Sequence, residues 1–238
     1  MEIKYKRILL KLSGEALAGN LHKGLDYETL VAVCKSVKKC LDLGVEVGIV
    51  VGGGNFWRGR ASIGQMERTR ADKIGMLATV MNSLALADAF QSIGVTAIVR
   101  TAVDMLAIAP RFTREDTLTD FASGRVVIFG GGTGSPFFST DTTAALRAAE
   151  IDADAILMAK MVDGVYDSDP KINKNAVRYD KISFSEILSK DLKVIDSTAA
   201  SMCRDNSIPV FVFSLEDTEN ILRAVKGENI GTILKEEK

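Results

Sequence analysis

Three glycine-bearing loops, each directly after an apolar segment, are the parts of this chain best suited to bind phosphate. They are Lys11-Leu12-Ser13-Gly14, Gly52-Gly53-Gly54 and Gly130-Gly131-Gly132-Thr133-Gly134. Glycines at a strand end let backbone N–H groups approach an anion, and the N-terminus of a following helix favours negative charge. Since one such loop holds one phosphate group, three loops indicate more phosphate than one mononucleotide carries. The pattern predicts an enzyme that binds a phosphate donor and a phosphate acceptor together.

Cationic side chains accompany the first two loops. Lys11 ends the first predicted strand, where its ammonium group reaches phosphates bound at the carboxyl edge of a sheet. The alternative, a lysine that extends into solvent, is disfavoured because Ser13-Gly14 follows it. Arg58 comes after Gly53-Gly54 and can bind a phosphate with two parallel hydrogen bonds. The glycine triplet alone could equally form a tight turn between a strand and a helix.

The third loop leads into a segment with more hydroxyl groups than a helix start requires. Ser139, Thr140 and Asp141 are N-cap residue types directly before a helical run. Capping explains one of these side chains but not the whole series through Thr143. The remaining hydroxyls and the aspartate predict a site that organises phosphates, bases or Mg²⁺.

Familiar nucleotide signatures are absent from the sequence. It contains no Gly-x-x-x-x-Gly-Lys-Ser/Thr P-loop and no protein-kinase His-Arg-Asp or Asp-Phe-Gly motif. The segment 132–137 lacks the last glycine of the dinucleotide fingerprint and has Pro136 where the helix should begin, which disfavours a Rossmann oxidoreductase. The single histidine, His22, lies in a polar stretch that is typical of a solvated loop. The chemistry must therefore depend on Lys, Arg, Asp and backbone dipoles.

Strand-like and helix-like patterns alternate along the chain. The predicted strands are 6–12, 45–51, 94–100, 125–130, 154–160 and 208–214. The predicted helices are 26–43, 66–93, 114–123, 140–151, 183–189, 196–206 and 217–226. Strands that are apolar on both faces suit a sheet covered by helices on both sides, and the alternation implies right-handed parallel crossovers. We predict an α/β fold, a three-layer α/β/α sandwich around a mainly parallel twisted sheet.

Two segments depart from this simple alternation. The segment 66–93 is apolar around most of its circumference, so it is buried in a core or between subunits. We favour a subunit interface over a purely internal helix because the chain is short. The polar connection 161–179 is long, and long loops in compact domains are usually functional. The alternative interpretation is that this connection is a solvated surface loop without a function.

Composition narrows the class of protein. The 238 residues have 47% hydrophobic and 26% charged side chains, as expected for a soluble globular protein. A net charge of -1 argues against broad binding to nucleic acid or membranes. No apolar run is long enough for a transmembrane helix, and the N-terminus does not resemble a signal peptide. The cysteines, Cys34, Cys40 and Cys203, lack metal-ligand spacing and predict reduced buried thiols in the cytoplasm.

Six motifs, in order along residues 6–234, together resemble the bacterial uridylate (UMP) kinases of the amino acid kinase superfamily. They are Lys11-Leu12-Ser13-Gly14, the segment Gly52 to Arg58, Asp72-Lys73-Ile74-Gly75-Met76-Leu77-Ala78-Thr79, the segment Gly132 to Ala144, the segment Val162 to Pro170, and Asp196-Ser197-Thr198-Ala199. The resemblance implies ATP-dependent phosphorylation of UMP to UDP in pyrimidine nucleotide synthesis, with Mg²⁺ bound to ATP. It also implies one domain over 1–238, with an acceptor-side half of about 1–152 and an ATP-side half of about 153–238.

Site residues follow from the resemblance, position by position. The implied catalytic residues are Lys11, Asp141 and Arg58. The implied ATP-binding residues are Lys11, Leu12, Ser13, Gly14, Gly54, Arg58, Lys160, Tyr166 and Asp169. The implied UMP-binding residues are Gly53, Asp72, Thr133, Gly134, Ser135, Pro136, Phe137, Phe138, Ser139 and Thr140. The segment implied in allosteric activation by GTP is Gly19, Asn20, Leu21, His22, Lys23 and Gly24. No residue is assigned as a metal ligand.

The family's assembly and regulation are also expectations for this chain. The resemblance implies a homohexamer of dimer pairs that is inhibited by UTP. Two positions depart from the family pattern: Ser135 stands where many relatives carry Asn, and Lys160 where Thr or Asn is common. A base contact from Ser135 would be shorter or mediated by water, and Lys160 could act as a second cation near the phosphates.

Two other functions stay open at the level of the sequence. The first is another kinase of the superfamily that phosphorylates a carboxylate or a carbamate. The second is a nucleotide-binding or oxyanion-storage protein without catalysis on the same fold. The second alternative gives no reason for Lys11, Asp72 and Asp141 to be present together.

Overall fold

The computed structural model describes residues 3–57, 66–168, 170 and 172–236. Its centre is one eight-stranded sheet within these residues, with strand order β3-β4-β2-β1-β5-β7-β8-β6. The strands are β1 (Arg7–Leu12), β2 (Glu46–Val51), β3 (Ala97–Thr101), β4 (Val126–Gly130), β5 (Ala155–Lys160), β6 (Lys181–Ile182), β7 (Val210–Ser214) and β8 (Gly231–Leu234). All neighbours pair in parallel except β7 and β8, which are antiparallel.

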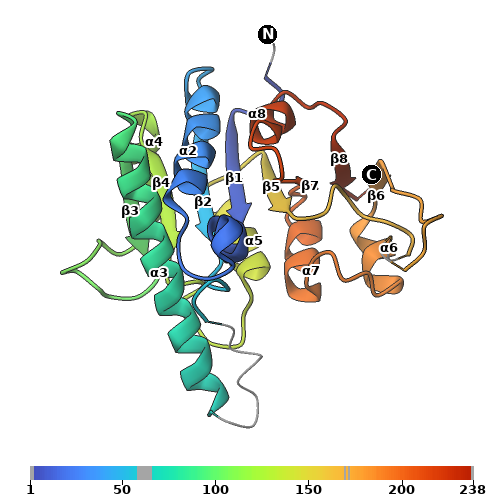
Figure 1. Ribbon diagram of the computed structural model, residues 1–238, viewed down its shortest axis with the longest axis horizontal. Coiled ribbons are helices and arrows are strands. Elements are labelled where there is room, and N and C mark those ends of the chain that lie inside the picture. The colour runs from blue at the N-terminus through green and yellow to red at the C-terminus, as the bar shows by residue number, and fades with distance from the viewer. Residues whose placement is uncertain (1–2, 58–65, 169, 171, 237–238) are drawn as a thin grey trace.

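Helices cover both faces of the sheet, as Figure 1 shows. The helices are α1 (Gly14–Leu17), η1 (Gly19–Leu21), α2 (Tyr27–Leu41), α3 (Arg68–Ser92), α4 (Arg114–Ala122), α5 (Thr140–Glu150), α6 (Phe184–Ser189), α7 (Ser197–Asp205) and α8 (Asn220–Val225). Buried residues of α2, α3 and α8 share one hydrophobic cluster, and those of α4, α5, α6 and α7 share a second. The two clusters lie on opposite faces, so the three-layer sandwich is confirmed.

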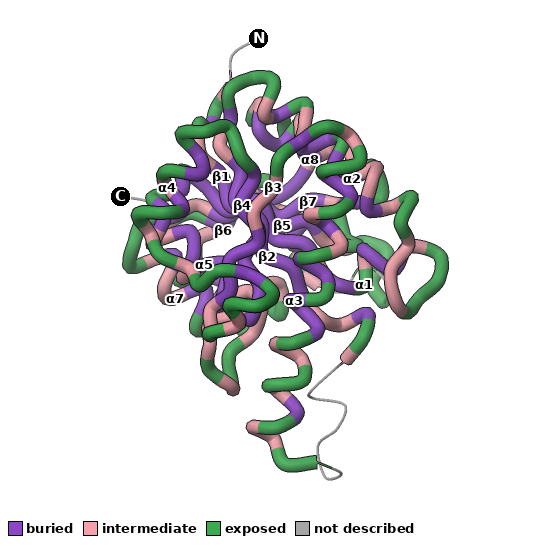
Figure 2. Tube along the Cα trace, turned by 90° about the vertical axis from the view of Figure 1, so that its left-hand side faces the viewer, coloured by how far each residue is buried: buried purple, intermediate pink, exposed green. Residues whose placement is uncertain are grey.

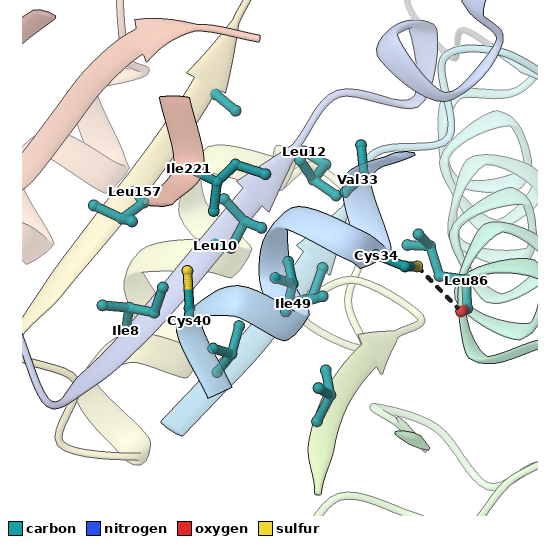
Figure 3. Packing of buried hydrophobic residues seen from close by; sticks show 14 of the residues in the cluster. Ile8, Leu10, Leu12, Val33, Cys34, Cys40, Ile49, Leu86, Leu157 and Ile221 are labelled. Carbon is teal, nitrogen blue, oxygen red and sulfur yellow. Dashed lines mark hydrogen bonds between the residues drawn. The ribbon is translucent and has the colours of Figure 1, made fainter. Parts of the chain in front are cut away.

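Strand β1 shows how the sequence pattern separates the two clusters. Ile8, Leu10 and Leu12 belong to the first cluster, whereas Leu9 belongs to the second. Successive side chains of a strand point to opposite faces, so a strand that is apolar at every position anchors a layer on each side. Figure 3 shows the first cluster, where Cys34 of α2 lies beside Leu86 of α3 with its thiol 3.8 Å from the Leu86 carbonyl oxygen.

All six predicted strands and all seven predicted helices are present, with boundaries that differ by at most three residues. The short elements α1, η1, β6 and β8 were not predicted from the sequence. Segments of two to four residues are too short for a periodic pattern, so their pairing depends on neighbours elsewhere in the chain. The strand β8 follows α8 in the chain and pairs antiparallel with β7. The strand β6 pairs with β8 and forms the edge of the sheet.

The topology places a crevice at the carboxyl ends of β1 and β5. The chain builds β2, β3 and β4 on one side of β1, then crosses to β5 on its other side. In open α/β sheets, ligands bind outside the carboxyl ends of strands where the strand order reverses in this way. Lys11 and Lys160 lie at this point, at the ends of β1 and β5.

Helix α3 extends well beyond the sheet, at the lower part of Figure 1. Large apolar side chains at helical spacing on this helix are partly uncovered: Ile74 36%, Leu77 51%, Met81 49% and Leu84 40% exposed. Figure 2 shows the same end of the helix as largely exposed and half-buried. Within the described residues, no helix is both long and apolar enough to cross a membrane.

Candidate active site

The first two glycine loops pack directly against each other beyond β1 and β2. The Gly52 N–H group donates to the Leu12 carbonyl oxygen at 3.0 Å. A Cβ atom on Gly14 would lie 2.6 Å from the Gly52 carbonyl oxygen and 2.8 Å from the Gly54 nitrogen. Because backbone atoms cannot rotate away as the end of a side chain can, only glycine fits at this position. The two loops therefore form one continuous backbone surface.

Two lysines and one aspartate meet between β1, β5 and α5. The Nζ atom of Lys11 lies 3.0 Å from Oδ1 of Asp141, and that of Lys160 lies 3.8 Å from Oδ2 of the same carboxylate. Lys160 also donates to the Val194 carbonyl oxygen. Burial lowers the pKa of Lys160, and Asp141 partly offsets this effect. Two largely buried ammonium groups lie beside the Asp141 carboxylate, and such groups can donate charge-assisted hydrogen bonds to a phosphate group.

A hydroxyl and carboxylate network fixes the start of α5. The Ser139 Oγ atom caps the helix, accepting from the N–H groups of Asp141 at 3.0 Å and Thr142 at 3.1 Å. The same hydroxyl donates to Asp196, and the Thr142 hydroxyl donates to Asp196 at 3.0 Å. Asp196 also caps α7 by accepting from the Ala199 N–H group at 2.9 Å. The network therefore joins the N-termini of two helices and sets the position of Asp141.

The third glycine loop has a left-handed backbone at three glycines. Gly131, Gly132 and Gly134 have φ angles of 81°, 61° and 87°, values that favour glycine. The Gly131 N–H group donates to Oγ1 of Thr79 on α3 at 2.9 Å. The Thr133 hydroxyl accepts from the Ser135 N–H group at 3.2 Å, which closes the loop on itself.

Asp72 links α3 to this third loop. Both oxygens of its carboxylate share the single Nε–H group of Arg68, at 2.9 and 2.8 Å, and Oδ2 also accepts from the Phe137 N–H group at 2.8 Å. The Arg68 guanidinium group lies 5.4 Å from the centroid of the Phe137 ring. Phe137 has a φ angle of 71°, which a phenylalanine rarely adopts. Phe137 and Phe138 are 63% and 52% exposed, so both rings are available to a planar ligand.

Two neighbouring clefts meet at the Lys160–Asp141 pair, since Asp141 lines the first and Lys160 lines the second. The first, of about 690 Å³, includes Asp72, Phe137, Phe138, Ser139 and Asp141 in its lining. The second, of about 460 Å³, is lined by Lys160, Tyr166 and Pro170 among others. Both clefts share the wall 191–193. The arrangement can hold two ligands whose ends meet at the lysines.

The predicted ATP side is described only in part. Tyr166 lines the second cleft, and its hydroxyl donates to Oδ1 of Asp163 at 2.8 Å; this bond to a carboxylate raises the pKa of the phenol. Leu12 and Ser13 lie where β1 meets α1, and Ser13 caps that helix by accepting from the Ala16 N–H group at 3.1 Å. Arg58 and Asp169, also predicted here, lie outside the described residues.

The predicted regulatory segment 19–24 lies away from both clefts. It includes η1, and three of its residues have a left-handed backbone: Gly19 with φ 49°, His22 with φ 60° and Gly24 with φ 75°. Gly19 and Asn20 line a third cleft of about 550 Å³ with Glu15, Thr218 and their neighbours. His22 and Lys23 are exposed, which agrees with a solvated loop.

The structure brings together most of the predicted site, and it adds residues for which no role was predicted. Lys11, Asp141 and Lys160 form one cluster, while Asp72 meets the segment 133–140 through Phe137. The residues without a predicted role are Arg68, Asp196 and the Val194 carbonyl group. Arg68 precedes Asp72 by four residues on one helix, a spacing that could have revealed the pair. Asp196 is 57 residues from Ser139, and nothing local signals that contact.

No group of three or more His, Cys, Asp or Glu side chains is placed to hold a metal ion in the part of the chain that the structure describes. Near the lysines, Asp141 and Asp196 both line the first cleft, and Asp196 already accepts hydrogen bonds from Ser139 and Thr142. Mg²⁺ commonly binds through one or two carboxylates, water and substrate phosphates. The donor set therefore fits a magnesium ion that is bound mainly by nucleotide phosphates.

The α/β/α sandwich, the glycine loops at strand ends and the lysine–aspartate cluster define a phosphoryl-group-binding protein of the α/β class. Residues 6–214 match the model of the amino acid kinase family, and the chain belongs to this family. The UMP kinase from Bacillus anthracis is 38% identical, with a TM-score of 0.94, over 98% of this chain and 97% of that chain. The UMP kinase from Ureaplasma parvum is also 38% identical, with a TM-score of 0.92, over 99% and 100% of the two chains. The uridylate kinase from Archaeoglobus fulgidus is 32% identical, with a TM-score of 0.74, over 95% and 99%.

Proposed function

We propose that this protein is a UMP kinase, which transfers the γ-phosphoryl group of ATP to UMP and yields UDP and ADP. The observation that carries the proposal is the lysine–aspartate cluster at two neighbouring clefts: Asp141 lines the first cleft, Lys160 lines the second, and Lys11 contacts Asp141. Full-length similarity to solved UMP kinases supports UMP as the acceptor. Phosphorylation of a carboxylate or carbamate and nucleotide storage without catalysis are both less favoured.

In this proposal UMP occupies the first cleft. Asp72 binds the ribose, because its carboxylate lies at the cleft wall and can exchange the Phe137 N–H group for sugar hydroxyls. The segment Thr133 to Thr140 surrounds the base and phosphate, and Gly53 contacts the phosphate from the second glycine loop. The exposed Phe137 and Phe138 rings provide apolar area for the uracil ring.

ATP occupies the second cleft and reaches the lysines with its phosphates. Tyr166 and Asp169 bind the adenosine portion, whereas Lys11 to Gly14, Gly54, Arg58 and Lys160 bind the phosphates. The side chain of Lys160 supports this role, because it lines the second cleft and its ammonium group is 3.8 Å from Asp141. In this way the acceptor-side half, about 1–152, and the ATP-side half, about 153–238, each hold one nucleotide within a single domain.

Phosphoryl transfer requires alignment and charge neutralisation rather than a covalent nucleophile. A phosphate oxygen of UMP attacks the γ-phosphorus in line, the bond from that phosphorus to the bridging β–γ oxygen breaks, and ADP leaves. The UMP phosphate is largely ionised near neutral pH, so no strong general base is needed. Lys11 and backbone N–H groups of the glycine loops stabilise the charge of the transferring group. Asp141 holds Lys11 in place, and together with the nucleotide phosphates it would hold Mg²⁺, which would neutralise further charge.

The decisive test is a coupled assay of ADP formation with UMP, CMP, acetylglutamate and carbamate offered separately. We expect turnover with UMP well above that with the other acceptors. Preference for an acid substrate would move the protein to another branch of the family. ATP binding without turnover of any acceptor would support the storage protein.

Assembly, regulation and location belong to the same proposal. The uncovered apolar residues of α3 suit a subunit contact in a homohexamer. We also propose the family's regulation, with GTP activation through the segment 19–24 and inhibition by UTP. Light scattering with and without each nucleotide tests the assembly.

Burial raises the pKa values of Cys34, Cys40 and Cys203 to about 12, so these thiols are unreactive structural residues that suit a cytoplasmic protein.

A further inference from the structure

Two buried asparagines, Asn55 and Asn82, bind each other side by side between the glycine loops and α3. Their exposed fractions are 3% and 0%. Each amide nitrogen donates to the other residue's Oδ1 atom, at 2.9 Å from Asn55 and 2.8 Å from Asn82. Buried polar groups are costly unless they are hydrogen-bonded, and this reciprocal pair satisfies both amides.

The second hydrogen of each amide binds a glycine carbonyl in a different loop. Asn55 Nδ2 donates to the Gly24 carbonyl oxygen at 2.7 Å, and Asn82 Nδ2 donates to the Gly52 carbonyl oxygen at 2.6 Å. The Gly24 N–H group in turn donates to the backbone carbonyl of Asn55 at 3.1 Å. The pair therefore connects the predicted regulatory segment to the second glycine loop and to helix α3.

The first glycine loop also contacts this pair. A Cβ atom on Gly14 would lie 2.6 Å from Oδ1 of Asn55. Gly14 thus rests against the same amide that binds Asn82. Lys11 is three residues earlier in the same loop, so a shift of Asn55 changes the separation between the loop that carries Lys11 and the loop Gly52-Gly53-Gly54.

We propose that Asn55 and Asn82 are positioning residues for phosphoryl transfer, which set the spacing of the first two glycine loops and connect them to the segment 19–24. This inference depends on the proposed function, because its effect is on the alignment of two nucleotides. Neither asparagine lines the two clefts, so both act through backbone groups. A small displacement of reacting groups costs roughly 10²-fold in rate, so loop spacing matters even where binding of each nucleotide survives.

A plain structural role, in which the amides only satisfy each other inside a packed interface, is the competing explanation. The two explanations differ in what they change. A structural role lowers the stability of the fold and the folded fraction, but leaves turnover per folded molecule unchanged. A positioning role lowers kcat per folded molecule, whereas the dissociation constants of UMP alone and ATP alone change little.

The test uses the full-length N82D and N55D variants. A carboxylate keeps the size of the amide but cannot donate to the Gly52 or Gly24 carbonyl oxygen. A protonated carboxyl group regains one donor, and burial raises the pKa of such a group. We expect kcat per folded molecule to fall roughly 10²-fold near neutral pH and to recover partly as the pH is lowered. Calorimetry should give dissociation constants for each nucleotide alone within about threefold of the wild type.

Two matched controls separate positioning from loss of stability. N206D makes the same chemical change at an exposed helix end, where Asn206 Nδ2 donates to the Met202 carbonyl oxygen at 2.8 Å. V37A removes buried apolar volume from α2 without touching a glycine loop. Both should keep wild-type kcat per folded molecule, and thermal melts give the folded fraction of every variant.

Hydrogen exchange provides the readout for the connection to the segment 19–24. Amides of this segment should exchange faster in N55D than in the wild type and V37A, because a carboxylate at position 55 cannot donate to the Gly24 carbonyl oxygen. Wild-type kcat in N82D and N55D would overturn the inference, as would a loss that tracks the folded fraction alone. If the wild type itself does not phosphorylate UMP, the proposed function fails, and the exchange comparison still tests the connection.

Discussion

The first two glycine loops and the third glycine loop hold their backbones in different ways. The first two are locked by buried contacts: Gly14 against Gly52 and Gly54, with the Asn55–Asn82 pair behind them. The third loop is anchored to α3 by one hydrogen bond from Gly131 to Thr79, and it leads into a surface segment that Asp72 holds at Phe137, next to two largely exposed phenylalanine rings. Rigid backbone suits phosphate, whose shape is constant, whereas a loop held by side chains can adjust to a nucleoside. We infer that alignment depends on the first region and acceptor affinity on the second.

Replacement of Lys11 by alanine is the strongest way to break the rigid region. We expect kcat to fall roughly 10²–10³-fold, the scale of losing one preorganised charge-stabilising group. Asp141 would then keep Lys160 as its cationic partner. Steady-state kinetics of ADP formation measures the effect. Near-normal turnover in K11A would refute the role of Lys11.

Replacement of Gly14 by alanine tests the same region through its backbone. The added Cβ atom would lie 2.6 Å from two oxygen atoms, so the two loops must separate. We expect kcat to fall roughly 10²-fold, because displacement of the loops misaligns the reacting groups. The comparison is G75A on α3, where a Cβ atom would meet one atom, at 3.8 Å, and alanine favours the helix. Equal kinetics for G14A and the wild type would show that the close approach does not matter.

Replacement of Asp72 by asparagine breaks the third loop instead. We expect the KM for UMP to rise about tenfold while kcat and the KM for ATP change little, since hydrogen bonds to charged groups contribute about 1.5–3 kcal/mol. The matched control is D88N, on the same helix, where Asp88 accepts from the Tyr27 hydroxyl at 3.0 Å. A fall in kcat with an unchanged KM for UMP would contradict the division between the two regions.

The smallest expected effect is a change in the pH dependence of ATP use, which tests the charge of Lys160. Burial lowers the pKa of Lys160, so this side chain loses its proton at a lower pH than the ordinary value of 10.5. The kcat/KM for ATP should therefore decline on the alkaline side below pH 10.5. In K160R the guanidinium group stays charged, and the decline should move to higher pH. Identical alkaline profiles for the two proteins would show that Lys160 does not bind phosphate in its charged form.

Local signals in the sequence predicted more of the fold than of the site network. Apolar strands and helix caps were visible because each depends on a few neighbouring residues. The Arg68–Asp72 pair could also have been predicted, because the two residues are four positions apart on one helix. By contrast, the Ser139–Asp196 and Asn55–Asn82 contacts join residues 57 and 27 positions apart, and an asparagine in a sequence gives no sign of its partner. The strand β8 was not predicted because its four residues are too few for a periodic pattern, and its pairing with β7 stabilises it in the fold.

The sequence by itself determined that apolar strands alternate with helices and end in glycine loops, because strand and helix periodicity and glycine's backbone freedom act over a few residues. It also placed Lys11 at a strand end and Asp141 at a helix start. The tertiary structure decided that both meet Lys160, that one amide pair ties three loops together, and that two clefts share a wall. These distances depend on how layers pack across the sheet, and packing is a property of the whole chain rather than of any segment.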